Sequence, residues 1–557
     1  MAAEQKNGIS SASSTFSIPA KEAEVGVTNG PNSSSSSSLP EYSLVDEGGV
    51  FGNSTNTALK NYYKPIDSYE GAHRYDPTAT WSEQEEKAIV RKIDWRIASW
   101  CCLMFFALQL DRGNISQALS DNMLDDLGLT TDQYNWGQTV FYISFLLAEL
   151  PSQLVSKKLG PDRWIPIQMC AWSIVASCQS KLNGYSSFMI CRTLIGLIEG
   201  GFIADVILYL SYFYKTKELP SRLSWFWTAY MGTQIIAAFL AFGILRLRGV
   251  HGMEGWRWLF ALEGSFTALI GILSWFYMPP SPTQTKGGLR GPDGWFSERE
   301  EIIMVNRVLR DDPSKGDMHN RQAVTPALLW SSLKDYDMWP IYIIGLTWTI
   351  PSGPMSSYLT LVLRSMGFST LTTNLLTVPA QALFIIILLS ITWLSERINQ
   401  RLLLGVAGQI WVLIPIVVLA VLPADAPKWG RYAACIFVVG QVYVHAILVS
   451  LTSRNAGSVR TRTVGSAVYN MTVQTGSIIS SNIYRSDDAP LYRRGNRVLI
   501  GVACMNIALF ILAKLYYMWK NKRRDRIWNA MSLEEKEIYL KTTEDKGNKR
   551  LDFRFAH

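Results

Sequence analysis

The sequence predicts an all-α membrane protein with about twelve transmembrane helices arranged in two six-helix bundles. Of its 557 residues, 48% are hydrophobic and only 18% are charged. The apolar residues are concentrated in runs of about twenty with few charges, which is the length that an α-helix needs to cross a bilayer. A polar stretch divides these runs into two sets of six, and such a division is typical of a duplicated, two-bundle architecture.

The runs place every expected span along the chain. The first six spans are expected at residues 97–119, 134–156, 164–182, 186–209, 223–245 and 258–278. The second six are expected at residues 339–361, 371–394, 402–422, 432–453, 463–484 and 498–519. The chain is thereby divided into a disordered cytoplasmic tail with an amphipathic lead-in (1–96), a first bundle (97–278), a cytoplasmic central loop (279–338), a second bundle (339–519) and a cytoplasmic tail (520–557).

The amino-terminal segment differs sharply from the spans. Residues 1–80 are rich in Ser, Gly and Asn and hold too few apolar side chains to form a core. Ser82 followed by Glu85 is a capping-box pattern, which predicts a short helix through Lys92 that lies against the inner face of the membrane. No apolar segment typical of a signal peptide precedes Ile97, so this end is expected to remain in the cytoplasm.

Basic residues predict the orientation of the spans. With both termini in the cytoplasm, most Lys and Arg residues near span ends fall on the inner side, as the positive-inside rule requires. The first outer loop instead holds four Asp residues between 121 and 132 and no Lys or Arg. Two outer loops depart from the rule, one at Arg246 and Arg248 and one with four Arg residues between 485 and 497.

Composition argues against several other classes of protein. The net charge of +8 comes from residues beside the spans, so nucleic acid is not an expected partner. All seven cysteines fall inside predicted spans without CxxC spacing, which indicates small core residues, so no metal or other cofactor is expected. A membrane enzyme is also disfavoured, because the chain has only five His residues and shows no nucleophile motif or catalytic spacing.

Charged side chains inside the spans mark the candidate site, because Asp, Lys or Arg near the bilayer centre costs about 2.5 to 3.5 kcal/mol. Arg192 and Glu199 stand seven residues apart, which places them two turns apart on one helix face, with Gly196 between them. This face offers a cation for an anion, a carboxylate for a proton, and room for the close approach of a helix or ligand. The alternative is a structural ion pair that joins this helix to Asp111 or Arg112 in the first span.

The adjacent residues Asp111 and Arg112 must point in different directions from their helix. Arg112 shares a face with Gln109 and Ser116, so it is the candidate to line the pathway. Asp111 is expected to compensate the charge of Arg112 or to serve as a second proton-coupling group.

Three further carboxyls lie within predicted spans. Glu149 and Glu263 are expected to form structural pairs and not to contact substrate. Asp205 faces away from Glu199 by helical spacing, and its role stays open.

The polar side chains of the second half are mostly neutral. Asn470 and Gln474 are candidate substrate contacts, because amides read hydrogen-bond donors and acceptors without adding charge, as Asn374 would also do. His445 is a candidate proton relay, since imidazole gains and loses a proton near neutral pH. The alternative for His445 is a simple interhelical hydrogen bond. The segment Pro351–Pro354 is expected to interrupt the seventh span, which is tolerated where backbone lines a cavity or a gate.

Several motifs resemble those of the anion:cation symporters of the major facilitator superfamily. They are the fourth-span stretch RTLIGLIEGGF at Arg192–Phe202, LDRGNI at Leu110–Ile115, GWRWLF at Gly255–Phe260 and NKRRD at Asn521–Asp525. The similarity extends from about Lys92 to Arg526. It implies the major facilitator fold, with one site near the midplane and alternating access by rocking of the two bundles.

Two loops resemble the inner-gate motif of the superfamily. Lys158–Arg163 is a degraded form of Gly-x-x-x-Asp-Arg, and Ser395–Arg401 occupies the equivalent place in the second half. The resemblance implies that these loops hold the inner gate through charge pairs with helix ends.

Within that family the fungal allantoate permease branch is the most similar, with members that carry allantoate, nicotinate, pantothenate, biotin, cysteine and sulfur oxyanions. The resemblance implies anion binding at Arg112 and Arg192 and proton coupling at Glu199. The chain departs from the branch at Ala204-Asp205, where Pro-Gly is common.

The predicted function is proton-coupled symport at the plasma membrane by a monomer embedded in the lipid bilayer. Its expected cargo is a small organic or inorganic anion, namely a carboxylate, sulfonate or sulfur oxyanion nutrient, a vitamin or a ureide. The alternative is a non-transporting nutrient sensor of the same fold, for which the Ser-rich tail would be the signalling element.

Overall fold

The computed structural model describes residues 64–65, 67, 69–215, 218–311, 330, 333–398, 400–423, 425–456, 459–543, 545 and 547–557. All of them belong to one compact unit, residues 48–557. Regular structure in this described part is helical throughout and includes no strand. Most of the Ser-rich tail and residues 312–329 of the central loop lie outside the described residues.

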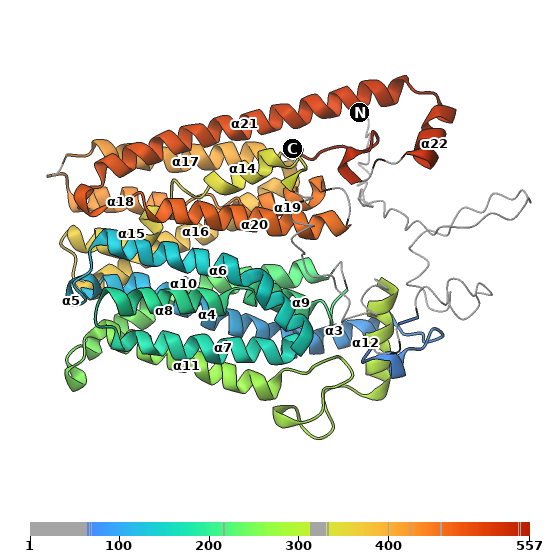
Figure 1. Cartoon of the computed structure of the whole chain (residues 1–557), viewed down its shortest axis with the longest axis horizontal. Helices are drawn as coiled ribbons and strands as arrows, with labels where there is room; N and C mark the ends of the chain where they lie inside the picture. Colours follow the sequence, from blue (N-terminus) through green and yellow to red (C-terminus); the bar gives the residue numbers. More distant parts are fainter. Residues whose placement is uncertain are drawn as a thin grey trace, which may run out of the picture. The chain divides into compact units, whose positions relative to one another are not determined.

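Every apolar run of the first half forms a helix or a pair of helices. They are α4 (Ser99–Leu119), α6 (Thr131–Leu159), α7 (Pro161–Cys178), α8 (Tyr185–Glu199) with α9 (Phe202–Leu210), α10 (Leu219–Ile244) and α11 (Gly255–Tyr277). Helix α7 packs along α11, α6 packs along α8, and α4 packs against both α10 and α11 (Figure 1). The spans of the first half thus pack mainly on one another.

The runs of the second half behave in the same way. They form α14 (Trp339–Thr347) with α15 (Gly353–Ser365), α16 (Thr370–Ile398), α17 (Arg401–Val421), α18 (Lys428–Val439) with α19 (His445–Asn455), α20 (Val459–Ser481) and α21 (Arg493–Ala530). Helix α17 packs along α21, and α14 packs along α20. Helix α21 continues past residue 519, where the last span was expected to end.

Three spans are interrupted, two of them at Gly or Pro residues. The fourth breaks at Gly200 and Gly201, where Gly201 has a φ of +89° that favours glycine. The seventh breaks between Thr347 and Gly353, as the prolines predict, with Pro354 in the first turn of α15. The tenth breaks between Val439 and His445.

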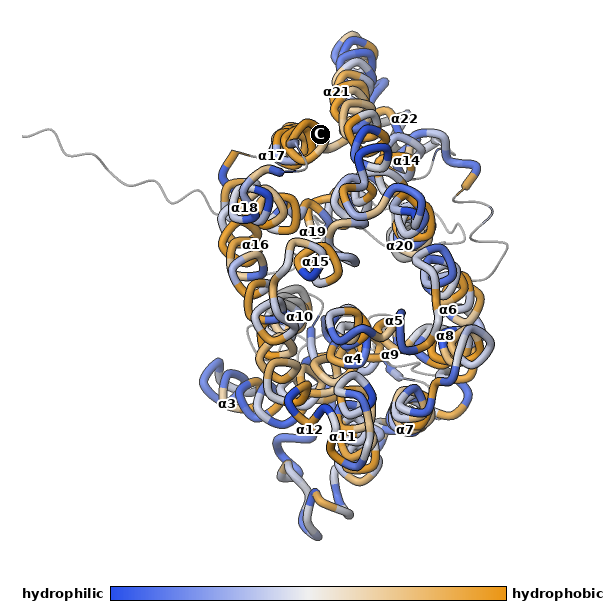
Figure 2. Tube along the Cα trace, turned by 90° about the vertical axis from the view of Figure 1, so that its left-hand side faces the viewer, coloured by the Kyte–Doolittle hydropathy of each residue, from blue (hydrophilic) through white to orange (hydrophobic). Residues whose placement is uncertain are grey.

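Length and apolar composition alone select seven helical stretches of the described chain as able to cross a membrane. They correspond to the first, second, fourth, sixth, eighth, ninth and twelfth of the expected spans. Large apolar side chains such as Leu147, Ile174, Ile386 and Leu512 stay exposed on the helices, as lipid-facing side chains do. Figure 2 shows hydrophobic residues prevailing along α16 and α17.

Two helices outside the spans, α3 (Glu83–Ile93) and α12 (Glu298–Asp311), pack together at one end of the first half (Figure 1). Ser82 accepts a hydrogen bond from the Glu85 backbone and begins α3, so the predicted capping box is confirmed. Helix α12 belongs to the central loop. The guanidinium of Arg307 is fully buried between Glu86 at 3.2 Å and Glu218 at 3.0 Å.

The expectation that residues up to 80 are disordered is wrong for residues 69–80. Arg74 forms ion pairs with Glu298 and Glu301 of α12. Asn306 of the same helix accepts a hydrogen bond from the Asp76 backbone at 3.0 Å. These contacts involve residues more than 200 positions away, so the local composition of the segment gave no sign of them.

The carboxyl-terminal residues pack on the second half. Lys549 binds both Asp335 and Asp337 at 2.6 Å, just before the start of α14. Phe555 stacks on Tyr517 of α21 with ring centroids 5.1 Å apart. Each half therefore carries its own cytoplasmic segments under the predicted topology.

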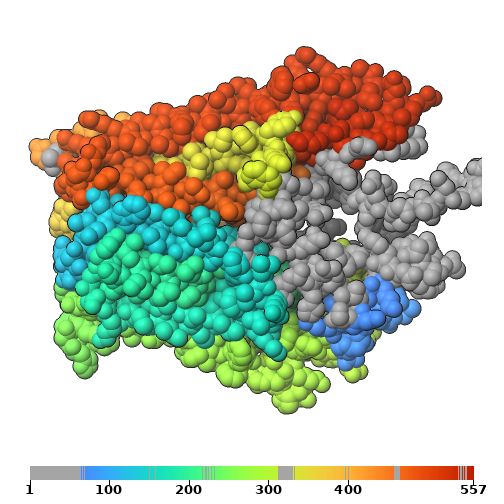
Figure 3. Space-filling model, viewed as in Figure 1, coloured from blue at the N-terminus to red at the C-terminus, as the bar shows by residue number. Residues whose placement is uncertain are grey.

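The two halves are joined by hydrogen bonds at the end that the sequence places outside. Asn135 of α6 donates to the Tyr484 backbone at 2.7 Å and accepts from Tyr358 of α15. The Ser486 hydroxyl donates to Asp132 at 3.0 Å. Helix α6 also packs along α20, and the space-filling view shows these two helices side by side (Figure 3).

One amide of this junction corrects an expectation. Asn374 of α16, a candidate reader of substrate, donates to the Ser120 hydroxyl at 2.9 Å. It is fully buried at the contact between the halves. Its observed partner therefore gives it a structural role at this end.

Candidate substrate and proton site

The first and fourth spans are joined by a buried ion pair. Arg112 Nε of α4 donates to Glu199 Oε2 of α8 at 2.7 Å. Glu199 is fully buried, whereas 22% of the Arg112 side chain is exposed. The partner of Glu199 is thus Arg112, which the sequence named as the structural alternative, and a ligand could reach the arginine more readily than the carboxyl.

Arg192 has a different partner from the one that helical spacing suggested. Its Nη2 donates to Gln138 Oε1 of α6 at 2.8 Å, and Gln138 in turn donates to the Tyr134 hydroxyl at 2.6 Å. Arg192 is 4% exposed. Gln138 was missed in the sequence, because one neutral amide in a span carries no sign of which helix it faces.

Both guanidinium groups lie over aromatic rings of α6. Arg192 is 4.5 Å from the Phe141 centroid, and Arg112 is 5.8 Å from the same ring and 5.0 Å from Phe145. Cation–π attraction stabilises a guanidinium in this position without neutralising it. Arg112, Arg192 and Glu199 therefore lie close together between the helices. Their two positive charges and one negative charge give a net charge of +1.

Several polar atoms of this charge cluster, defined as Arg112, Arg192 and Glu199, have no hydrogen-bond partner. They are Arg112 Nη2, Arg192 Nε and Glu199 Oε1, all of them buried. A buried polar atom without a partner costs about 1 to 3 kcal/mol, and more when the group is charged. The cluster therefore has unused capacity to bind an oxyanion and a proton.

The glycines of the fourth span admit a helix and not a ligand. A Cβ added at Gly196 would lie 2.4 Å from the Phe141 carbonyl oxygen, and one at Gly200 would lie 2.8 Å from the Phe145 carbonyl oxygen. Both contacts are with the backbone of α6. Close packing of α6 on α8 is what brings the two Phe rings under the arginines.

Asp111 points away from this cluster, as its adjacency to Arg112 predicts. The indole of Trp172 on α7 donates to Asp111 Oδ2 at 3.2 Å. Glu263 of α11 interacts with Asp111 electrostatically and lies beside Asn114. The structural pair expected for Glu263 is therefore with other polar groups of the bundle, and Asp111 does not offset Arg112 directly.

The break in the fourth span is surrounded by its own polar contacts. Asp205 of α9 is fully buried and accepts a hydrogen bond from Ser152 at 3.2 Å. Gln168 donates to the same serine at 3.0 Å and to the Gly200 carbonyl at 3.2 Å. Asp205 thus faces α6 and α7, away from the charge cluster.

The candidates of the second half lie on α19 and α20. The Tyr469 hydroxyl of α20 and His445 Nδ1 of α19 are 3.4 Å apart, a long interhelical hydrogen bond. Asn470 is exposed and Gln474 is half-buried, both on α20. Helix α20 packs on α6, which carries the Phe rings.

The described residues include no group of three or more His, Cys, Asp or Glu side chains that could hold a metal ion. All seven cysteines are free thiols, with Cys101 and Cys435 buried and Cys178 and Cys504 exposed. The prediction that they are all core residues is therefore wrong for the two exposed ones, which lie on outward-facing helix surfaces.

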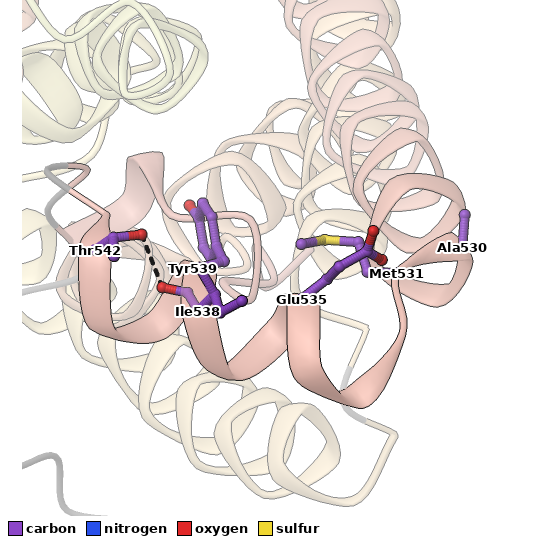
Figure 4. Close-up of a pocket in the computed structure, with 6 residues that line it drawn as sticks. All are labelled: Ala530, Met531, Glu535, Ile538, Tyr539 and Thr542. Carbon is purple, nitrogen blue, oxygen red and sulfur yellow. Dashed lines mark hydrogen bonds between the residues drawn. The ribbon is translucent and has the colours of Figure 1, made fainter.

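A surface pocket lies far along the chain from these charges. It is lined by residues of α21 and of α22 (Leu533–Thr542), with Glu535 as its one acidic group (Figure 4). The Thr542 hydroxyl in its wall is already bound to the Ile538 carbonyl at 2.7 Å. The lining offers no arrangement of charges comparable to that around Arg112.

Apolar helices with large apolar side chains on their exposed faces and charges buried between them are the features of an integral membrane protein. The family model described as Major Facilitator Superfamily matches residues 101–481. The chain belongs to this superfamily and has its fold.

Relatives agree with this membership, and a solved structure agrees with the fold. An uncharacterized transporter of Saccharomyces cerevisiae is 46% identical over 490 residues, which cover 88% of this chain and 90% of the relative. An MFS-type transporter of Hormonema carpetanum is 26% identical over 441 residues, 79% of this chain and 87% of that protein. A bacterial homolog of the human lysosomal transporter Spinster, solved in an inward-facing and unoccupied conformation, has a TM-score of 0.58 at 14% identity and covers 78% of this chain and 98% of its own. The chain is thus a transporter and not an enzyme.

Proposed function

We propose that this transporter imports a small anion together with protons, across the plasma membrane, as a monomer with both termini in the cytoplasm. The cargo is a carboxylate, sulfonate or sulfur oxyanion nutrient, a vitamin or a ureide, as expected for the anion:cation symporters and their allantoate permease branch. The observation that carries the proposal is the buried charge cluster, in which two guanidinium groups share the Phe141 ring and only one carboxylate opposes them.

Electrostatics favours an anion at this cluster. Opposite unit charges 4 Å apart attract by about 4 kcal/mol at the effective dielectric of a protein near water. An anion between the arginines would neutralise the excess positive charge and could supply partners to Arg112 Nη2 and Arg192 Nε. The planar fork of a guanidinium suits carboxylate, sulfonate and sulfate oxygens equally well.

The same geometry links the anion to a proton. Arg112 now binds Glu199 at 2.7 Å. An anion that takes over the Arg112 guanidinium leaves Glu199 buried without its cation, and a buried carboxylate without a partner is strongly disfavoured. Glu199 then takes a proton, and anion and proton cross together as the two bundles rock.

Membrane energetics sets the stoichiometry. An inside-negative potential opposes anion entry by about 2.3 kcal/mol per charge for each 100 mV. A monoanion with one proton is electroneutral and responds only to the pH gradient, which supplies about 1.4 kcal/mol per unit. A dianion needs at least two protons, for which Asp111 and His445 are the further candidates.

The second half is proposed to read the uncharged part of the cargo. Asn470 and Gln474 lie on α20, which packs on α6, the helix whose Phe141 ring lies under both arginines. Amides at these positions would distinguish cargo by hydrogen bonding without changing the charge balance.

The experiment that tests the proposal begins with a substrate screen. A strain that lacks the gene is grown on single nitrogen, sulfur and vitamin sources, and any source that fails to support growth is then tested as a labelled substrate. Uptake of an anion that rises with external acidity is the expected result. Uptake of a neutral or cationic compound, insensitive to pH, would refute the proposal.

A further inference from the structure

A second group of buried polar side chains lies on the opposite face of α4 from Arg112. Asp111 and Asn114 are three residues apart on α4, and Glu263 and Thr267 are four apart on α11, so each pair shares a helix face. The four are 5%, 1%, 3% and 0% exposed, respectively. Helices α4 and α11 pack together, and the two faces meet.

The polar atoms of these four residues are largely without partners. Asp111 Oδ1, Glu263 Oε2, Thr267 Oγ1 and both amide atoms of Asn114 have no hydrogen bond. Asn114 nevertheless lies beside Glu263, and Thr267 lies beside Asp111. Four oxygen atoms from two helices therefore converge without a donor among them other than the Thr267 hydroxyl and the Asn114 amide.

Charged groups around these residues do not compensate the two carboxyls. Glu199 also acts on Asp111, but its charge is opposed by Arg112. Trp172 contributes only a neutral donor. On the helices packed around α4 and α11, the described basic side chains lie near helix ends, as Arg163 of α7, Arg222 of α10, Arg257 of α11 and Arg364 of α15 do.

Two carboxylates side by side in a dry bundle are unstable unless a positive charge is shared between them. We propose that Asp111, Glu263, Asn114 and Thr267 form a binding site for one monovalent cation, either a proton or a sodium ion. The site offers four unpartnered oxygens, fewer than the six to eight that Ca²⁺ takes.

A charge count supports a single monovalent occupant. Arg112 and Arg192 are opposed by three carboxylates, Glu199, Asp111 and Glu263, so these five groups have a net charge of −1. One monovalent cation makes the set neutral. An anion that then binds between the arginines adds one negative charge, which the proton taken up by Glu199 in the proposed symport neutralises.

The cation site adds to the proposed symport. It depends on that proposal only where an arriving anion and the proton at Glu199 enter the charge count. Its occupancy is a property of the resting protein and is measured without any substrate. Failure of the cation site and failure of anion transport are therefore distinguishable.

The proton is tested by infrared spectroscopy on the purified full-length protein in lipid nanodiscs at neutral pH. The expected result is a carbonyl band of a protonated carboxylic acid that shifts in deuterated water. It should change position in Asp111→Asn and in Glu263→Gln, because the buried carboxyl that remains still takes a proton, and it should be lost in Asp111→Asn/Glu263→Gln. Glu534→Gln, which removes an exposed carboxyl on α22, should leave the band unchanged.

Sodium is tested by thermal unfolding of the same samples in sodium chloride, potassium chloride and choline chloride at equal ionic strength. A bound sodium ion would raise the melting temperature in sodium chloride alone, and the rise should vanish in either variant. The double variant Asp111→Asn/Glu263→Gln removes both charges and should need no cation, so it is expected to remain folded even if a single variant does not.

The two arms together decide the proposal. A band or a sodium effect that depends on Asp111 and Glu263 supports the site and identifies its occupant. Wild-type protein that shows neither signal, or signals that persist undiminished in the double variant, would overturn it.

Discussion

Replacing Glu199 by Gln is expected to separate anion movement from proton movement. The amide keeps the shape of the side chain, and its oxygen still accepts the hydrogen bond from Arg112 Nε, which is 2.7 Å long in the wild type. The charge cluster, however, changes from a net charge of +1 to +2. Anion binding should be retained or strengthened, whereas the proton loses its carrier, because an amide does not titrate.

The magnitude of the effect follows from the energy of moving charge. With a pH difference of one unit, a wild-type carrier of one monoanion and one proton accumulates its cargo up to about tenfold, since a unit is worth about 1.4 kcal/mol. Without the proton the anion crosses as a charge, and an inside-negative potential of 100 mV opposes it by about 2.3 kcal/mol, or about fiftyfold. The variant should therefore exchange its cargo but never concentrate it.

The assay uses proteoliposomes with a clamped membrane potential, an imposed pH gradient and labelled substrate. Exchange of labelled for unlabelled substrate should persist in Glu199→Gln, while net accumulation disappears. Glu534→Gln is the matched control, because it makes the same chemical change at an exposed position of α22. Accumulation by Glu199→Gln at the wild-type level would show that the pair with Arg112 is structural.

Four further outcomes are expected. Arg192→Lys should weaken anion uptake at least about tenfold at matched surface expression, since an ammonium cannot reproduce the planar fork; an unchanged KM would remove Arg192 from the binding site. Gly196→Ala should destabilise the protein by about 1 to 3 kcal/mol, because its Cβ meets the backbone of α6 at 2.4 Å; Gly232→Ala, with open space around it, is the control in the same melting experiment. Deleting residues 1–63 should leave uptake intact, and loss of a starvation response with normal uptake would instead favour the sensor. The hydrogen bond from Arg299 lowers the pKa of Glu85 from 4.5 to about 2. The bond between Glu85 and Arg299 should therefore stabilise the contact of α3 with α12 above pH 4.5 and be lost only as the pH falls toward 2. Loss of hydrogen-exchange protection in α12 when the pH is lowered only to 6 would contradict this.

Local features of the fold were predictable because they depend on neighbouring residues. The apolar runs became helices, and the Ser82 capping box and the interruption beside Pro351 appeared where expected. Opposite directions for Asp111 and Arg112 follow from the 100° turn between adjacent helical residues. Each of these inferences needs only the periodicity of one helix.

The partners of the site residues were not predictable in the same way. Spacing put Arg192 and Glu199 on one face of α8, but Glu199 binds Arg112 and Arg192 binds Gln138. The sequence indicated that Gly196 and its neighbours leave space for a ligand or a helix, and in the structure the backbone of α6 fills that space. Which helix lies against a face depends on packing between distant segments, and a single sequence does not specify it.

By itself the sequence determined that this chain crosses the membrane many times, and it marked the rare charges whose burial demands a reason. Hydrophobic runs and costly intramembrane charges are properties of the residues alone. Only the tertiary structure decided how those charges are grouped, because the rotation of each helix about its axis sets what its side chains meet. That rotation put Arg112 and Arg192 over Phe141 with Glu199, and it turned Asp111 toward Glu263 on the far side of α4.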